Sequence, residues 1–353
     1  MMKLDAALPP VPLTEVPEIA RAAEALGFDC LWTTETMHDP FLPHALIAEH
    51  TQHIKMGTGI AVSFARSPAT LAYTAWDLAA QSKGRFILGL GTQVKAHIER
   101  RFGMTWPDSV TGKLREQIQV IRAFWNTWQT GAPLNFRGEY YKITLMSPFF
   151  NPGPLPAPLV SPNSTELHQS GRDGRGVPIY IAGVNTGLAK LAGELCQGFH
   201  VHPFHTPRYL KETLLPAIEE GASKNGRQRM DVMVTVSVFA ATEPQEREFC
   251  RQQVAFYAST PSYRSVLELH GWGEIGEKLS ALAARGQWAE MPALVNDEML
   301  AAFLTEADTP DALAAALKER YASLADRLTL YLPFRPGQND AWWRALVSAF
   351  RAV

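Results

Sequence analysis

The chain has 353 residues, 46% of them hydrophobic and 19% charged, and a formal net charge of −2. This composition is typical of a globular protein, and the small net charge argues against a nucleic-acid or membrane-surface partner. The three cysteines are far apart and form no CxxC pair, so neither a zinc ribbon nor a disulfide framework is supported. The N-terminus lacks the apolar core of a signal peptide, and no stretch approaches the roughly 18 apolar residues of a membrane helix. We therefore expect a cytoplasmic protein.

Eight short apolar runs recur along the chain, and each is followed by a helical pattern or a plausible place for one. The runs cover residues 4–8, 30–34, 56–62, 86–91, 179–182, 199–203, 232–240 and 328–332. Strand followed by helix, eight times, predicts an α/β fold of the (β/α)8 barrel type. A doubly wound sheet is the rival arrangement. We expect a single domain over residues 1–353.

Helical patterns are clearest in four places. The first helix is predicted from about Thr14, as its N-cap, to Gly27. Residues 114–128 place apolar side chains at 4-3-4-3 spacing, which indicates an amphipathic helix. Residues 188–195 do the same, and Gly198 is expected to end that helix. A last helix carries the apolar residues Trp342, Leu346 and Phe350.

Two insertions enlarge the predicted barrel, which typically needs only about 250 residues. The first follows strand 4 and covers about residues 132–177. It contains NFRGEYYKI, a hairpin pattern, and then a proline-rich stretch. The second follows strand 7 and covers about residues 258–310. Both are too long to be simple connections, and we expect them to be lids.

The fourth run, GRFILGLGTQ, ends in Gly89 and Gly91 and continues into Thr92, Gln93 and His97. A dinucleotide fingerprint is one reading, but its third glycine is missing. In a barrel, the carboxyl end of a strand faces the active-site mouth. There the glycines either let a flat ligand approach the backbone or relieve crowding between strands, and the residues beyond them are polar mouth residues.

The third run, KMGTGIAVSFARSP, appears together with LGFDCLWTTE, GRFILGLGTQ and IYIAGVNTG. In this order and spacing the four stretches resemble the luciferase-like monooxygenase superfamily, most of all its coenzyme F420-dependent oxidoreductase branch. The resemblance covers nearly the whole chain apart from the two insertions. It implies a TIM barrel that holds a reduced flavin or deazaflavin across the strand ends.

The resemblance also implies where the cofactor binds. It places a cis peptide at Gly59–Ile60 behind the ring system and the ribityl phosphate at the turn over residues 182–186. The alternatives are a plain strand with packing glycines, and a simple N-cap at Asn185 or Thr186. The expected cofactor-binding residues are Gly59, Ile60, Thr92, Gln93, Ala182, Gly183, Val184, Asn185 and Thr186.

The catalytic candidates are Glu35, His38, His97 and His202. Many relatives carry an acidic residue and then a histidine after strand 2, whereas here Glu35 is followed by a threonine and the nearest histidine is His38. Some deazaflavin enzymes use a glutamate shortly after strand 4, and His97 is a possible substitute for it here. In the sixth run His200 and His202 share one face of a strand, and His202 lies nearer the carboxyl end. Histidine suits general acid work, although a hydrogen-bonded core histidine is the alternative.

The leading hypothesis is hydride transfer between reduced coenzyme F420 and a small organic substrate. The first alternative is a monooxygenase that uses FMN and O2. Others are a metal-dependent hydrolase built on His200 and His202, whose acidic ligands are not evident, and a cofactor-binding barrel without catalysis. We assign no metal ligands and expect neither nucleic acid nor membrane as partner, and we leave a homodimer open.

Cations near the mouth favour F420, because its acidic tail extends beyond the phosphate at which FMN ends. The candidate cations are Arg66, Lys95, Arg172 and Arg175. The alternative is that each is an ordinary solvated charge.

Overall fold

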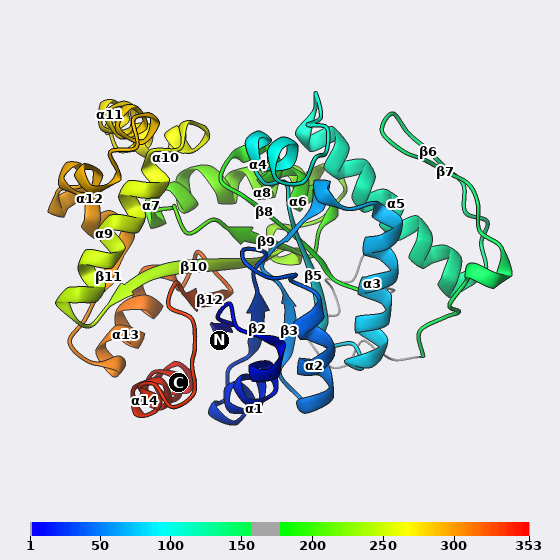
Figure 1. Ribbon diagram of the computed structural model, residues 1–353, viewed down its shortest axis with the longest axis horizontal. Helices are drawn as coiled ribbons and strands as arrows, with labels where there is room; N and C mark the ends of the chain where they lie inside the picture. The colour runs from blue at the N-terminus through cyan, green and yellow to red at the C-terminus, as the bar shows by residue number, and fades with distance from the viewer. Residues whose placement is uncertain (1, 157–176, 353) are drawn as a thin grey trace.

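The computed structural model describes residues 2–156 and 177–352. In it, parallel strands close into a barrel that is surrounded by helices (Figure 1). In barrel order the strands are β1 (Lys3–Ala7), β2 (Cys30–Thr33), β3 (Lys55–Thr58), β5 (Phe86–Gly91), β8 (Ile179–Gly183), β9 (Gly198–Val201), β10 (Met233–Ala241) and β12 (Arg327–Leu330). β10 pairs with both β9 and β12, and β12 returns to β1, so these eight strands form a closed barrel. This closure confirms the predicted (β/α)8 barrel and rules out the doubly wound sheet.

All eight predicted runs are strands, and the third is interrupted. β3 stops at Thr58, and a two-residue strand β4 (Ala61–Val62) continues the path and pairs with β5. The Gly59–Ile60 peptide between them is cis, as the resemblance implied. The Gly59 N–H donates to the Thr33 carbonyl at 2.6 Å, and the Ile60 carbonyl accepts from the Glu35 N–H at 3.3 Å. Both contacts tie the interruption to the end of β2.

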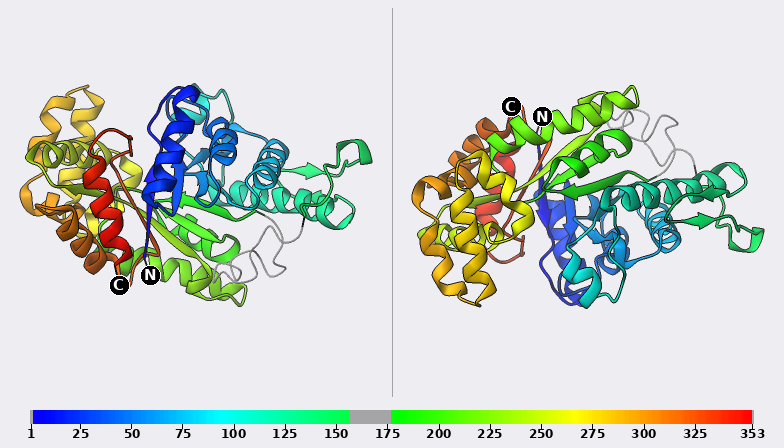
Figure 2. Two further views of the ribbon diagram at one scale, coloured as in Figure 1. Left: turned by 90° about the horizontal axis from the view of Figure 1, so that it is seen from below. Right: turned by 90° about the horizontal axis from the view of Figure 1, so that it is seen from above.

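Helices follow the strands around the outside of the barrel (Figure 2). They are α1 (Val16–Leu26), α2 (Leu42–His50), α3 (Pro68–Gln81), α4 (Lys95–Arg100), α5 (Val110–Thr130), α6 (Thr186–Leu195), α7 (Pro207–Tyr209), α8 (Leu215–Lys224), α9 (Pro244–Ala258), α13 (Pro310–Tyr321) and α14 (Asp340–Arg351). Both views of Figure 2 place the two termini side by side, where β12 and β1 close the barrel.

Two of the predicted helix ends are wrong. α1 begins after a 3-10 turn over Leu13–Glu15, so Glu15 and not Thr14 precedes it, while Gly27 ends the helix with a φ of 95° as expected. α6 ends at Leu195, and Gly198 lies inside β9 instead of ending that helix. A Cβ on Gly198 would lie 2.5 Å from the ring of Tyr180. Close packing between strands therefore explains this glycine.

The predicted amphipathic helix is α5, and its apolar stripe is buried against the barrel and α3. Trp125 lies 6.3 Å from Trp76 between ring centroids and donates from its indole N–H to the Ala72 carbonyl at 3.1 Å. The stripe consists of Leu114, Ile118, Ile121, Trp125 and Trp128, all buried. Full burial of such a side chain stabilises the fold by about 1.5–3 kcal/mol, so this stripe anchors the helix.

The two insertions lie at opposite ends of the molecule (Figures 1 and 2). In the first, β6 (Phe136–Arg137) and β7 (Lys142–Ile143) form the expected antiparallel hairpin, and residues 157–176 lie outside the described part. The second contains α10 (Arg264–Leu269), α11 (Gly273–Ala284) and α12 (Asp297–Phe303). It ends in β11 (Leu304–Glu306), which pairs with β10 outside the barrel.

A buried ion pair crosses the barrel interior near β1 and β12. Both oxygens of Asp5 accept from the Arg327 guanidinium, at 2.7 and 2.8 Å. The Trp32 indole N–H donates to the same carboxylate at 2.8 Å. Asp5 and Arg327 are each only 1% exposed. The pair therefore has almost no contact with solvent.

Candidate active site

A cavity of about 1000 Å³ opens at the carboxyl ends of the strands. In a (β/α)8 barrel this end is the active-site face, and the volume lies at the upper end of the range for ligand pockets. On one side it is lined by residues at or beyond the ends of β2, β3, β5, β8 and β9. On the other side the lining comes from β1, β10, α9 and β12 and from the residues that follow them. The cavity is thus large enough for a cofactor and a substrate together.

Gly89 and Gly91 on β5 are explained by close packing. A Cβ on Gly89 would lie 1.8 Å from the Thr58 carbonyl oxygen, and one on Gly91 would lie 2.5 Å from Cδ1 of Ile60. Neither position can accept a larger residue without moving the backbone or the neighbouring side chain. Gly91 also lines the cavity, so crowding and ligand access are compatible explanations there.

Gly59 and Ile60 both line the cavity, and Gly59 is different from the packing glycines. The nearest atom to a Cβ on Gly59 would belong to Trp32, at 3.4 Å, which is an ordinary van der Waals contact. The protein itself therefore leaves room beside Gly59. A flat ligand can lie against the backbone at this point.

Thr92 and Gln93 also line the cavity, directly beyond β5. Gln93 has a φ of 60°, and its side-chain oxygen accepts from the Val94 N–H at 3.0 Å. This left-handed turn starts α4, whose first residue, Lys95, is at the cavity rim. His97 lies on α4 as well, but its side chain is exposed and is not among the residues that line the cavity.

The turn from β8 into α6 brings Ala182, Gly183, Val184 and Asn185 to the cavity, whereas Thr186 is exposed and outside its lining. Asn185 occupies the N-cap position, but no side chain caps α6. Its amide instead donates to the Ser262 carbonyl at 2.9 Å and accepts from the Ser265 hydroxyl at 2.8 Å. These contacts tie the turn to the second insertion.

The first N–H groups of a helix have no partner within the helix and attract anions. Because the N-cap side chain makes no hydrogen bond to these N–H groups of α6, a ligand phosphate can accept from them. Gly187 and Leu188 at the start of α6 line the cavity as well. Neither residue is among the predicted binding residues, which end at Thr186.

Glu35 holds the end of β2 to the continuation of strand 3. Its carboxylate accepts from the Val62 N–H at 2.6 Å and from Arg66 at 2.7 Å. Arg66 also donates to Asp39 at 3.1 Å. The guanidinium is therefore engaged by two carboxylates, and it is not a spare cation at the mouth. His38, in the same loop, is exposed and outside the cavity lining.

His202 follows β9 and lines the cavity. Its ring packs between Tyr257 and Tyr263, with centroid distances of 4.8 and 4.7 Å. Its Nδ1 accepts from the Phe204 N–H at 3.1 Å, so the proton of the neutral ring is on Nε2. Burial, together with the neighbouring His205, lowers the pKa of His202 to about 3. His202 is therefore a neutral hydrogen-bond donor near pH 7.

His200 also lines the cavity, as its predicted shared face with His202 requires. Its ring lies 4.7 Å from Trp32 and 5.4 Å from Tyr180 between centroids. Its Nε2 is buried and has no hydrogen-bond partner. Within the described residues no group of three or more His, Cys, Asp or Glu side chains is arranged to hold a metal ion, and His200 is packed among aromatic rings.

Two other histidines, His44 and His205, are fully buried, and their burial predicts that the folded state loses stability in acid. His44 contacts the Thr33 hydroxyl at 2.9 Å, and His205 lies between the His202 carbonyl and Tyr321. Burial lowers the pKa of His44 to about 3 and that of His205 to about 4. Unfolding restores an ordinary value of about 6.5, so the unfolded state binds more protons below that pH.

We therefore expect the free energy of unfolding to fall by about 2 kcal/mol for each of these two histidines between pH 7.5 and pH 5. The loss begins below about pH 6.5 and ends near the folded values of 3 to 4. Urea unfolding as a function of pH measures it. His205→Gln should reduce the slope, and the exposed His53→Gln should not. An unchanged stability down to pH 5 would contradict the assignment.

The comparisons with known proteins agree with this architecture. The luciferase-like monooxygenase family model matches residues 3–327, so the chain belongs to that family and is an enzyme of it. An uncharacterised protein of Mycobacterium tuberculosis is 40% identical over 99% of this chain and 98% of its own length. The F420-dependent glucose-6-phosphate dehydrogenase of Mycobacterium avium is 30% identical over 69% of each chain.

Solved structures share the fold over almost the whole chain. The coenzyme F420-dependent tetrahydromethanopterin reductase from Methanopyrus kandleri superimposes with a TM-score of 0.74, at 20% identity over 99% of this chain and 98% of the other. The oxygenating component of 3,6-diketocamphane monooxygenase from Pseudomonas putida, solved with FMN, gives a TM-score of 0.64 at 16% identity, over 99% and 97%. Among the described helices none is long and apolar enough to cross a membrane.

Proposed function

We propose that this chain is an oxidoreductase that transfers a hydride between coenzyme F420 and a small organic substrate. The observation that carries the proposal is the uncapped start of α6, in a cavity whose rim also bears Lys95. The first feature suits a phosphate, and the second suits the negative charges that follow the phosphate only in F420. The dependence of the Mycobacterium avium relative on F420 supports the same choice.

The described residues fit such a group. Gly59 and Ile60 would lie against the flat ring, since both line the cavity and a Cβ at Gly59 would come no closer than 3.4 Å to any neighbour. Thr92 and Gln93 would border the ring, and the turn over residues 182–187 would hold the phosphate. Thr186 is the one predicted binding residue in this turn that lies outside the cavity lining.

F420, when bound, supplies or accepts the hydride at a ring carbon. The chain must then handle a proton at the substrate. Of the three histidines proposed for this role, His202 lines the cavity, and His38 and His97 do not. Its Nε2–H can donate a hydrogen bond to a substrate oxygen and stabilise negative charge that develops there. Glu35 acts differently, because its carboxylate positions strand 3 through Val62 and Arg66.

The alternative is a monooxygenase that uses reduced FMN and O2. The same ring and phosphate contacts would serve FMN, and the Pseudomonas putida monooxygenase with this fold was solved with FMN. The two proposals differ at the charges beyond the phosphate. Lys95 is described and lines the rim, Arg66 is engaged by two carboxylates, and Arg172 and Arg175 lie outside the described residues.

Lys95→Glu tests the proposal. The Lys95 side chain is 65% exposed and only weakly paired with Glu99, at 3.8 Å. An exposed ion pair contributes about 0.2–1 kcal/mol, so we expect roughly threefold weaker F420 binding at low salt and unchanged FMN binding. Calorimetric titration measures both. Lys278→Glu, an exposed lysine on α11, is the matched control. Equal effects of the two substitutions would show that Lys95 does not contact the tail of F420.

A further inference from the structure

We infer that the part of the cavity between β1, β12 and α9 binds an uncharged substrate with an apolar body and a hydrogen-bond-accepting oxygen. This inference rests on the proposed function, because it assigns the cofactor to the other side. The proposed cofactor residues follow β3, β5 and β8, which are neighbours in the barrel, whereas β10, β12 and β1 are neighbours on the remaining side. The lining there includes Leu8, Pro10, Phe249, Tyr257, Leu330 and Tyr331.

This side of the cavity carries no charge among the described residues that line it. Across the whole described lining, the residues with ordinarily charged side chains are Glu35 and Lys95. Glu35 is paired with Arg66, and Lys95 is at the rim of the other side. His202, at the boundary, is neutral because burial, aided by His205, lowers its pKa to about 3. An anionic substrate would lose its hydration here without gaining a counter-ion, which is costly.

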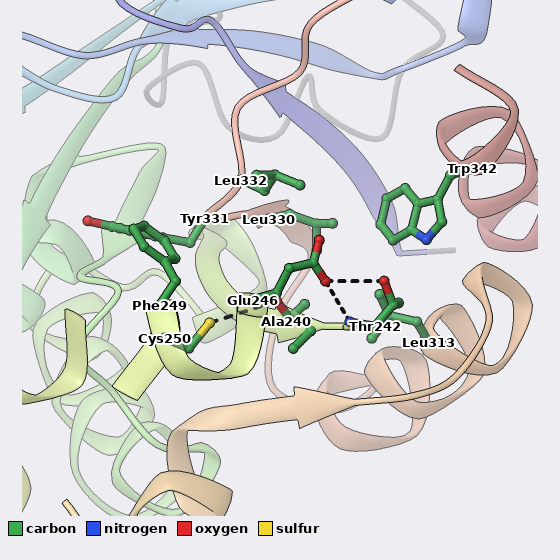
Figure 3. A pocket seen from close by; sticks show the side chains of 11 residues that line it. Ala240, Thr242, Glu246, Phe249, Cys250, Leu313, Leu330, Tyr331, Leu332 and Trp342 are labelled. Carbon is green, nitrogen blue, oxygen red and sulfur yellow. Dashed lines mark hydrogen bonds between the residues drawn. The ribbon is translucent and has the colours of Figure 1, made fainter. Parts of the chain in front are cut away.

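Behind this wall lies the carboxylate of Glu246, and it faces another way. A small side cavity of about 30 Å³ lies beyond Phe249 and Tyr331, which line both cavities. Figure 3 shows Glu246 in this side cavity with its carboxylate turned to Thr242, where it accepts from the backbone N–H at 2.7 Å and from the hydroxyl at 3.1 Å. Its charge is therefore used within the α9 cap.

The hydroxyls of Tyr257 and Tyr331 on this wall already have partners. The Tyr331 hydroxyl donates to Gln253 at 3.2 Å, so in the contact of 2.7 Å with Tyr257 it is the Tyr257 hydroxyl that donates. Neither hydroxyl proton is left for a ligand. The Nε2–H of His202, whose ring packs edge-on to Tyr257, is then one donor available to a substrate oxygen. The hydroxyls of Thr235 and Thr329, which line the cavity from β10 and β12 and have no hydrogen-bond partner, are others. These donors suit an uncharged acceptor oxygen on an apolar body.

The test uses two probes of the same shape that differ in charge, 2-acetylnaphthalene and 2-naphthoate. Each is titrated into the F420-loaded protein and followed by calorimetry. We expect the ketone to bind at least tenfold more tightly than the carboxylate. Equal affinities, or tighter binding of 2-naphthoate, would overturn the inference.

Two substitutions on α9 locate the site. Phe249 is 45% exposed and lines the cavity, and Phe256 is 49% exposed and does not. Because both side chains are already half exposed, lysine is tolerated at either position. Phe249→Lys should raise 2-naphthoate affinity to at least that of the ketone, and Phe256→Lys should leave the tenfold preference unchanged. Identical behaviour of the two variants would contradict the location.

F420 titration of the same proteins separates this inference from the proposed function. Normal F420 binding without any preference for the ketone would overturn the inference alone. Absence of F420 binding in the unmodified protein would overturn the proposed function, and with it the assignment of the two sides of the cavity.

Discussion

Replacing Gly187 with aspartate is expected to weaken cofactor binding at least tenfold, which corresponds to about 1.4 kcal/mol. Gly187 is the second residue of α6 and lines the cavity. A Cβ there would meet only Thr111, at an ordinary 3.4 Å. A carboxylate in the first turn of a helix is favourable for the helix itself. Here, however, it would take the place of the phosphate and repel its negative charge. Affinity should therefore fall without loss of stability.

Gly187→Ala is the matched control, because it adds the carbon without the charge. Its affinity should stay within about twofold of the unmodified protein by calorimetry, and thermal unfolding should show both variants folded. Gly183 is a poorer position for this test, since a Cβ there would lie 2.8 Å from Cβ of Leu188 and disturb the turn. If the aspartate variant bound the cofactor normally, the phosphate would have to lie elsewhere.

Asp5→Ala is expected to reduce the free energy of unfolding by about 3–5 kcal/mol, because it removes the carboxylate that binds the buried Arg327 guanidinium through both oxygens. Burial opposes the charge on Arg327, but the Asp5 carboxylate outweighs burial and raises the pKa of that guanidinium above its ordinary value. The variant loses that carboxylate, but a guanidinium keeps its proton in proteins, so Arg327 stays charged and the cost remains. The Trp32 indole N–H would also lose its acceptor.

The double variant Asp5→Leu with Arg327→Met provides the comparison. Replacing both members of a buried ion pair with apolar residues of similar volume is often close to neutral, so the double variant should be more stable than Asp5→Ala. Urea unfolding at pH 7 measures both. A loss below about 1 kcal/mol for Asp5→Ala would show that water or another carboxylate replaces Asp5.

The fold was predictable because strand burial leaves a clear pattern. Parallel strands covered on both faces read as continuous apolar runs, and each of the eight runs is a strand. The ends of individual helices were harder to predict. Gly198 has the pattern of a helix stop, yet the ring of Tyr180 is what requires a glycine there. Such a reason depends on a contact between neighbouring strands and is not visible in local sequence.

The candidate site was predictable where residues directly follow a strand. Gly59, Gln93 and Gly183 line the cavity because strand ends meet there. His97 does not, because the turn at Gln93 starts α4 and leaves that side chain exposed. Nothing in the local sequence indicated that Tyr257 lines the cavity. It is the penultimate residue of α9, and its position at the mouth depends on how that helix packs.

Parallel titration of the protein with coenzyme F420 and with FMN, at low and high salt, tests the central claim most directly. We expect F420 to bind at least tenfold more tightly than FMN, and its affinity to weaken with salt because contacts with the acidic tail are exposed and screened. FMN binding that is as tight or tighter, or F420 binding that salt does not change, would contradict the claim and favour the flavin monooxygenase.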